Sequence, residues 1–127
     1  MKDEIARAVE LIEQTVKELT LAYQQQKEAG EAAARADHAY RQAQAAAWLR
    51  VKADSTLSPK PTEAHAKAIV DDACDREMLA CRLAEAARDS ATLNVKRLMT
   101  QTTALQTVLN AYRAEGNAIG GGFHTGA

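Results

Sequence analysis

The sequence predicts an all-α protein, an elongated antiparallel helical hairpin or open helical bundle that assembles into a homo-oligomer. Three observations lead to this prediction. Of the 127 residues, 28 are alanine, the strongest helix former, and two are proline. Apolar side chains recur at alternating intervals of four and three residues, which is typical of a helix with one buried stripe. Both prolines lie in the stretch Ser58-Pro59-Lys60-Pro61, so one sharp turn separates two long helical regions.

The first helix is expected over residues 3–29. Its apolar residues follow a coiled-coil seam of nearly three heptads. The members of this seam are Ile5, Val9, Ile12, Val16, Leu19 and Tyr23. Beyond them the same positions hold Gln26 and Gly30. Because a glycine inside a helix costs about 1 kcal/mol relative to alanine, we expect a kink or short break at Gly30, although the sequence leaves open whether the helices on its two sides are continuous.

A second helix is expected over residues 31–55, where alanine dominates and Trp48 is the bulky anchor of a narrow apolar stripe. A third is expected over residues 62–115, with Thr62 as its N-cap and Glu63 favourably placed in its first turn. The heptad seam of the third helix consists of Val70, Cys74, Cys81, Ala84, Ala91, Val95, Leu98, Thr102, Leu105, Leu109 and Tyr112. Gly116 is expected to end this helix, leaving residues 116–127 as a flexible glycine-rich tail.

The lengths of these segments fit a hairpin. Residues 31–55 and 62–87 are nearly equal in length and are joined by a short loop, so they can pack side by side within one helical domain over residues 1–115. Full burial of a leucine or isoleucine contributes about 1.5–3 kcal/mol, and alanine contributes far less. A lone subunit would therefore have a thin core, and we expect subunits to associate. The number of subunits stays open.

The bulk properties argue against a membrane span and against secretion. The longest wholly apolar run, Ala45–Leu49, is far shorter than the roughly 20 residues that a spanning helix needs. The N-terminus is too acidic and too amphipathic for a signal peptide. We therefore expect a cytoplasmic protein.

The sequence contains no recognisable catalytic or metal-binding pattern. The histidines, His38, His65 and His124, have no serine or cysteine partner at motif spacing. Cys74 and Cys81 lie about 10 Å apart along one helix, too far for a bond between them, and are expected to be small buried apolar residues. There is neither a C-x-x-C nor an H-x-x-x-H spacing, and no glycine loop that could cradle a phosphate. We expect no enzyme activity, no metal and no cofactor.

Positive charge gathers around the turn, although the whole chain has a formal net charge of −1. Residues 32–67 carry six Lys and Arg against three Asp and Glu. Such a cluster can neutralise phosphates, and Trp48 could either stack on an unpaired base or anchor the hairpin. The candidate nucleic-acid-binding residues are Arg41, Arg50, Lys52, Lys60 and Lys67. An ordinary solvated helix end would also explain these charges.

The stretch Leu49-Arg50-Val51-Lys52 before the turn, and Lys67 with Ala68-Ile69-Val70-Asp71 after it, resemble the UvsY-type recombination mediators of T-even phages. In that family a Leu-Lys-x-Arg stretch precedes a polar tip that contains glycine. Here the two basic types are exchanged and the tip is Ser-Pro-Lys-Pro. The resemblance covers about residues 35–115. It implies a closed oligomer that binds single-stranded DNA along a basic surface and helps a RecA-like recombinase displace single-strand-binding protein, in the host cytoplasm if the protein is phage-encoded.

Two functional hypotheses therefore stand at the level of the sequence. The first is a single-stranded-DNA-binding recombination accessory protein that uses the basic turn. The second is a coiled-coil scaffold or adaptor without nucleic-acid binding, because the N-terminal heptad seam needs a partner helix whatever the function is. A gel shift with an unstructured oligonucleotide at low salt distinguishes them.

Overall fold

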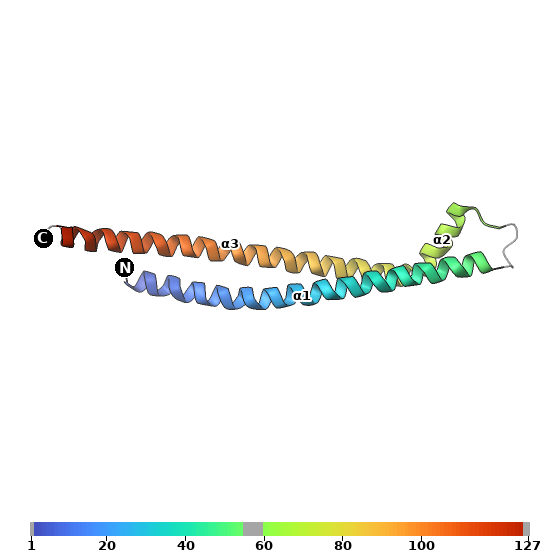
Figure 1. Cartoon of the computed structure of the whole chain (residues 1–127), viewed down its shortest axis with the longest axis horizontal. Helices are drawn as coiled ribbons and strands as arrows, with labels where there is room; N and C mark the ends of the chain where they lie inside the picture. The colour runs from blue at the N-terminus through green and yellow to red at the C-terminus, as the bar shows by residue number, and fades with distance from the viewer. Residues whose placement is uncertain (1, 55–59, 126–127) are drawn as a thin grey trace. The chain divides into compact units, whose positions relative to one another are not determined.

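The computed structural model of the chain is all-α and describes residues 2–54 and 60–125, with side chains as far as residue 118 (Figure 1). Helix α1 spans Lys2–Ala53, α2 spans Glu63–Ala73 and α3 spans Asp75–Thr125. Contacts divide the chain into a terminal unit, residues 1–26 and 91–127, and a central unit, residues 27–90. Over the described ranges, no helix has an apolar stretch long enough to cross a membrane.

In the terminal unit the first part of α1 packs against the second part of α3. Ala22, Val95 and Leu98 form a buried cluster, and Leu19 packs against it. The side-chain amide of Gln26 donates to the Thr92 hydroxyl at 3.4 Å. Since partners on α3 come earlier in the chain as α1 advances, the two segments are antiparallel, and the predicted helical hairpin is confirmed.

The predicted seam of α1 is confirmed in part, because Ile5, Val9, Ile12 and Leu19 are half-buried, but the fully buried line differs from it. It runs through Ala8, Thr15 and Ala22, which are each at most 5% exposed, whereas the predicted Val16 and Tyr23 are 44% and 46% exposed. The small residues let the backbones of α1 and α3 approach closely, and the larger side chains one position later lie at the side of the contact. The seam predicted for residues 62–115 is confirmed, because every one of its members is buried or half-buried.

In the central unit, α1 packs against α2 and the beginning of α3. Ala47, Val70 and Cys74 are each at most 2% exposed and form the buried cluster. Partly buried side chains from α1 surround this cluster, namely Tyr40, Ala43, Trp48 and Val51. The predicted alanine stripe with Trp48 beside it is therefore confirmed as packing between helices.

The interruption of the long helices lies elsewhere than the sequence suggested. α1 continues through Gly30 without a break, because one glycine costs less than the hydrogen bonds on either side of it contribute. The interruption falls at Cys74, whose φ of −105° and ψ of 12° leave the helical region and separate α2 from α3. Asp71, Asp72 and Asp75 surround this point, and aspartate is a poor helix former. In Figure 1, α2 turns away from the line of α3 at this point.

The ends of the helices agree with the sequence at one place and differ at another. Thr62 is the N-cap of α2, as predicted, since its hydroxyl accepts a hydrogen bond from the His65 N–H at 3.2 Å. The predicted end of α3 at Gly116 is wrong, because the backbone stays helical to Thr125. No proline follows Gly116 to stop the helix, and Gly116 does not adopt the left-handed conformation of a helix cap. The predicted end of the second helix at residue 55 lies outside the described residues.

Candidate nucleic-acid interface

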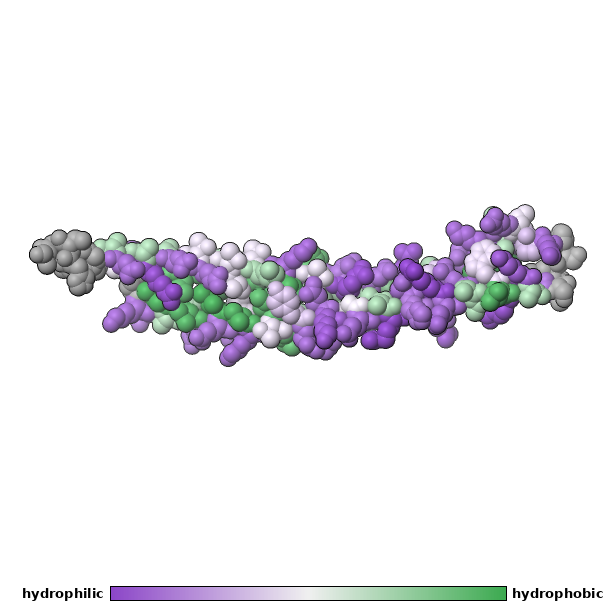
Figure 2. Space-filling model, viewed as in Figure 1, coloured by the Kyte–Doolittle hydropathy of each residue, from purple (hydrophilic) through white to green (hydrophobic). Residues whose placement is uncertain are grey.

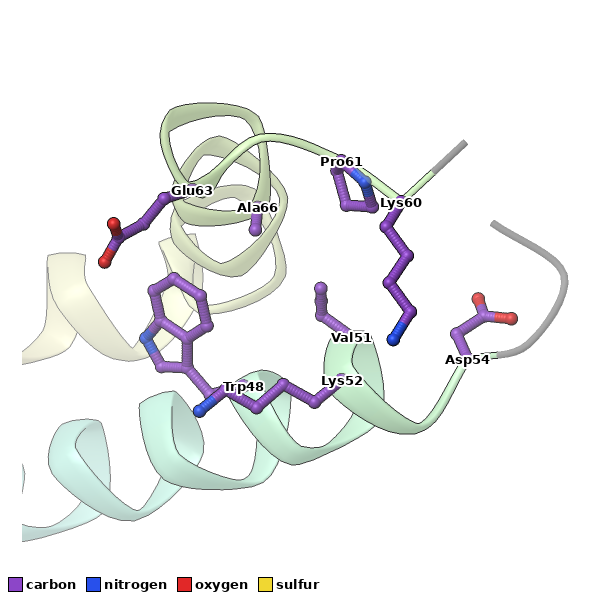
Figure 3. A pocket seen from close by; sticks show the side chains of 8 residues that line it. All are labelled: Trp48, Val51, Lys52, Asp54, Lys60, Pro61, Glu63 and Ala66. Carbon is purple, nitrogen blue, oxygen red and sulfur yellow. The ribbon is translucent and has the colours of Figure 1, made fainter. Parts of the chain in front are cut away.

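A hollow of about 890 Å³ lies in the central unit, between the end of α1 and the beginning of α2 (Figure 3). Two lysines, two carboxylates and an indole share its wall with smaller apolar groups. Its lining residues are Trp48, Val51, Lys52, Asp54, Lys60, Pro61, Glu63 and Ala66. Two of the five predicted basic residues, Lys52 and Lys60, therefore line one concave surface together with two carboxylates.

Trp48 forms the apolar wall of this hollow. Its indole rises from α1 toward Glu63 and Ala66 at the beginning of α2 (Figure 3). The side chain is half-buried and packs against the core cluster of the central unit. The two interpretations left open from the sequence therefore do not exclude each other, because the indole both anchors the hairpin and lines an open cavity.

Lys52 and Lys60 bring positive charge to the hollow from the two sides of the loop. Lys52 lies one helical turn after Trp48 on α1, so both point to the same side of that helix. Lys60 reaches from the segment before α2 toward α1 (Figure 3). Both residues are exposed, and neither forms an ion pair within the described part of the chain. Their ammonium groups are available to an anionic ligand.

Asp54 and Glu63 place negative charge in the same hollow, which the sequence interpretation did not include. These carboxylates weaken the positive potential of the two lysines at close range. Both residues are exposed, so the surrounding water and salt screen the effect. The hollow therefore presents two ammonium groups to an anion, but its four charged side chains have no net positive charge.

Arg50 lies on a different side of α1 from Lys52. Two residues correspond to a rotation of about 200° around a helix, so adjacent members of the basic stretch face apart. Arg50 lines a second hollow of about 270 Å³, which also includes Ile69 and Ala73. Val51 and Asp54 belong to both hollows, so the two are neighbours.

Arg41 and Lys67 line neither of these hollows. The Arg41 guanidinium forms an ion pair with Asp37, with 3.0 Å between Nε and Oδ2. Arg41 is also 11 residues before Lys52, about 16 Å along the axis of α1. Lys67 is exposed on α2. Of the five predicted residues, the structure groups Lys52 with Lys60, places Arg50 beside them, and separates Arg41 and Lys67 from this group.

A second cluster of chemically active side chains was not predicted. Asp37, Cys81 and Glu85 converge between α1 and α3 of the central unit. Burial raises the pKa of the Cys81 thiol, and the hydrogen bond from this thiol to Glu85 raises it further. The i, i+4 spacing of Cys81 and Glu85 is visible in the sequence, but the approach of Asp37 depends on the alignment of α1 with α3. Both cysteines are free and buried, as predicted.

Comparisons with known proteins add no relative to this description. No protein-family model matches the chain, and no curated protein or solved structure is significantly similar to it.

Proposed function

We propose that this protein binds single-stranded DNA and acts as a recombination mediator that helps load a RecA-like recombinase. The observation that carries the proposal is the hollow that Lys52, Lys60 and the Trp48 indole line together. Lysines bind phosphates as mobile point charges, and an indole offers a flat face to a base. These are the two kinds of contact that proteins use to hold a nucleic-acid strand without reading its sequence.

The hollow favours a single strand over a duplex. Stacking on Trp48 requires a base that is free on one face, and bases inside a duplex are already stacked on their neighbours. In the proposed complex the backbone passes Lys52 and Lys60, and one base turns toward Trp48. Arg50, in the neighbouring hollow, contacts the next phosphate along the strand.

One such hollow is a modest binding site, because Asp54 and Glu63 oppose its lysines. Several copies of the hollow on one assembly would bind a strand far more tightly, since each contact after the first is intramolecular. Self-association is therefore part of the proposal. It also explains how a chain of net charge −1 can bind a polyanion.

The mediator step depends on the resemblance of the basic turn to the UvsY-type family. We expect the protein to raise the rate at which a RecA-like recombinase replaces single-strand-binding protein on DNA. A variant that no longer binds single-stranded DNA should lose this stimulation.

The binding step is tested by fluorescence anisotropy with a labelled oligodeoxythymidine at several salt concentrations. Replacing both Lys52 and Lys60 by alanine should lower the affinity. If each lysine contacts one phosphate, the slope of log K against log salt becomes less steep by about 1.4 per protomer engaged. The matched control replaces Lys17 and Lys96, two exposed lysines of the terminal unit, by alanine. It removes the same charge and should change the slope much less.

An unchanged affinity and slope in the Lys52 and Lys60 double variant would remove this assignment. The absence of any binding at low salt would favour the second candidate, a helical scaffold or adaptor. The exposed apolar residues of the terminal unit support that candidate (Figure 2). On α1 and α3 they are Leu11, Val16, Leu21, Tyr23, Leu93, Met99 and Val108.

A further inference from the structure

Three donor groups meet in the contact between α1 and α3 of the central unit. The Asp37 carboxylate comes from α1, and the Cys81 thiol and Glu85 carboxylate come from α3. One ligand atom from each lies within 4.8 Å of the other two. Cys81 is buried, whereas the two carboxylates are half-buried, so the cluster has one inner member and an opening to solvent.

A further carboxylate lies on α3, one helical turn before Cys81. Glu77 precedes Cys81 by one helical turn on the same face of α3, and its Oε2 is buried without a hydrogen-bond partner in the described part of the chain. A buried carboxylate oxygen without a partner is costly, and a nearby cation offsets that cost. This oxygen is an observation separate from the three converging donors.

The donor set selects the kind of cation. Calcium and magnesium require six or more oxygen ligands, so a site that includes a thiol suits them poorly. Zinc accepts sulfur and carboxylate oxygen together in a tetrahedron, with bonds of about 2.3 Å to sulfur and 2.0–2.2 Å to oxygen. These bond lengths place ligand atoms about 3.6 Å apart. Donors within 4.8 Å of one another reach that separation by small side-chain rotations.

We propose that Asp37, Cys81 and Glu85 bind a zinc ion between α1 and α3. The Cys81 thiol, which donates to Glu85 Oε1 at 3.5 Å, loses its proton to solvent when the metal binds. Arg41 holds Asp37 Oδ2 through its Nε, and such a contact orients a ligating carboxylate and balances part of its charge. The ion joins the two long helices, and this site is independent of DNA binding.

The test uses Co²⁺ as a spectroscopic probe for the zinc site, on the full-length protein kept reduced and freed of metal with a chelator. One equivalent of Co²⁺ should give a thiolate-to-cobalt charge-transfer band in the near ultraviolet, and Zn²⁺ should abolish that band. Cys81→Ser should eliminate it. Cys74→Ser is the matched control, because Cys74 is also a buried free thiol of the central unit but does not belong to the cluster. The control should keep the band.

Glu85→Gln and Asp37→Asn keep both thiols and should each weaken Co²⁺ binding at least tenfold. Arg41→Gln should weaken it less, because Arg41 acts through Asp37. Far-ultraviolet circular dichroism of each variant shows whether the helices are retained, so the carboxylate variants decide the result if Cys81→Ser does not fold. Bound Zn²⁺ should also raise the melting temperature of the wild type and not that of Cys81→Ser.

A wild-type protein without the charge-transfer band would overturn the zinc site. So would a band that survives Cys81→Ser and disappears in Cys74→Ser. The affinity for oligodeoxythymidine, measured with and without chelator, should be the same, so the fate of this site and that of the proposed function are decided separately.

Discussion

The Trp48 side chain combines packing with exposure. It packs against the buried cluster of Ala47, Val70 and Cys74. It also lines the hollow, together with Lys52 and Lys60. Its indole therefore has one side in the packing between helices and another side toward open space. Its emission therefore reports on both the fold of the central unit and the occupancy of the hollow.

Trp48 is the one tryptophan of the chain, so its fluorescence can be followed without mutation. We expect oligodeoxythymidine to quench this emission, because a base stacks on the indole. An abasic phosphodiester of the same length should bind more weakly and leave the emission nearly unchanged, since it makes only the phosphate contacts. Equal affinities with unchanged emission for both oligomers would mean that the strand does not reach Trp48.

Cys74 gives a second prediction at this scale. Burial raises the pKa of its thiol, the Glu77 carboxylate raises it further, and Arg50 acts in the opposite direction. A thiol whose pKa is higher in the folded than in the unfolded state contributes its full stabilisation below the unfolded-state pKa, about 8.5. This stabilisation is lost as the pH rises through the folded-state pKa. The urea concentration at which half of the wild-type protein is unfolded should therefore decrease as the pH is raised above ~8.5.

Lysines and tyrosines also titrate in that range, so the comparison needs a variant without the thiol. The fall should be smaller in Cys74→Ala, measured at the same protein concentration. A parallel fall in both proteins would show that the Cys74 thiol ionises equally easily in the folded and unfolded chains.

Single residues show how far the sequence alone can locate the site. The grouping of Lys52 and Lys60 follows from a loop that returns on itself, and it was predicted. The separation of Arg50 from Lys52 follows from helical geometry and could have been predicted, because two positions apart means opposite sides of a helix. The contribution of Asp54 and Glu63 depends on how α2 leaves the loop, which no local pattern determines.

At the scale of helices, the spacing of apolar residues predicted which segments are helical better than it predicted which face of each helix is buried. The seam of α3 was predicted because leucines and valines mark it strongly. In α1 two parallel lines of residues lie one position apart, one small and one bulky, and periodicity fits both. The buried line is the one with Ala8, Thr15 and Ala22, because close contact with a partner helix favours small side chains. Only the packing of α1 against α3 shows which of the two lines is buried.

Gly30 tests the continuity of α1. A Cβ at this position would have no atom within 4 Å, and the backbone is helical there. Gly30→Ala should therefore raise the free energy of unfolding by about 0.5–1 kcal/mol, chiefly by restricting the unfolded chain. Thermal or urea unfolding at fixed protein concentration measures this change.

Gly116→Ala is the matched control, because a Cβ there also meets open space. Its gain should be smaller, since Gly116 lies near the end of α3, where opening is local and contributes less to global unfolding. A loss of stability in Gly30→Ala would instead support the break that the sequence suggested.

For the molecule as a whole, the composition of the core points to association. Among the residues whose side chains the structure describes, five of the 11 buried hydrophobic ones are alanine and two are cysteine. The sequence predicted this thin core from its alanine content, but not which surface remains exposed, because that depends on how the helices align.

We therefore expect light scattering to give a mass that is a multiple of 13.7 kDa. The surface to change lies in the terminal unit, where Val16, Tyr23 and Met99 are 44–47% exposed and the Tyr23 hydroxyl donates to the Met99 sulfur at 3.4 Å. Burial of such a patch by a second copy adds the apolar area that the alanine core lacks.

Val16→Glu combined with Met99→Glu should therefore lower the mass in solution and reduce helicity on dilution. Leu79→Glu with Leu83→Glu adds the same charge to exposed leucines of the central unit and should do neither. A wild type that stays fully helical at the mass of one chain would show that this core suffices alone, and the avidity on which the proposed DNA binding depends would then have no source.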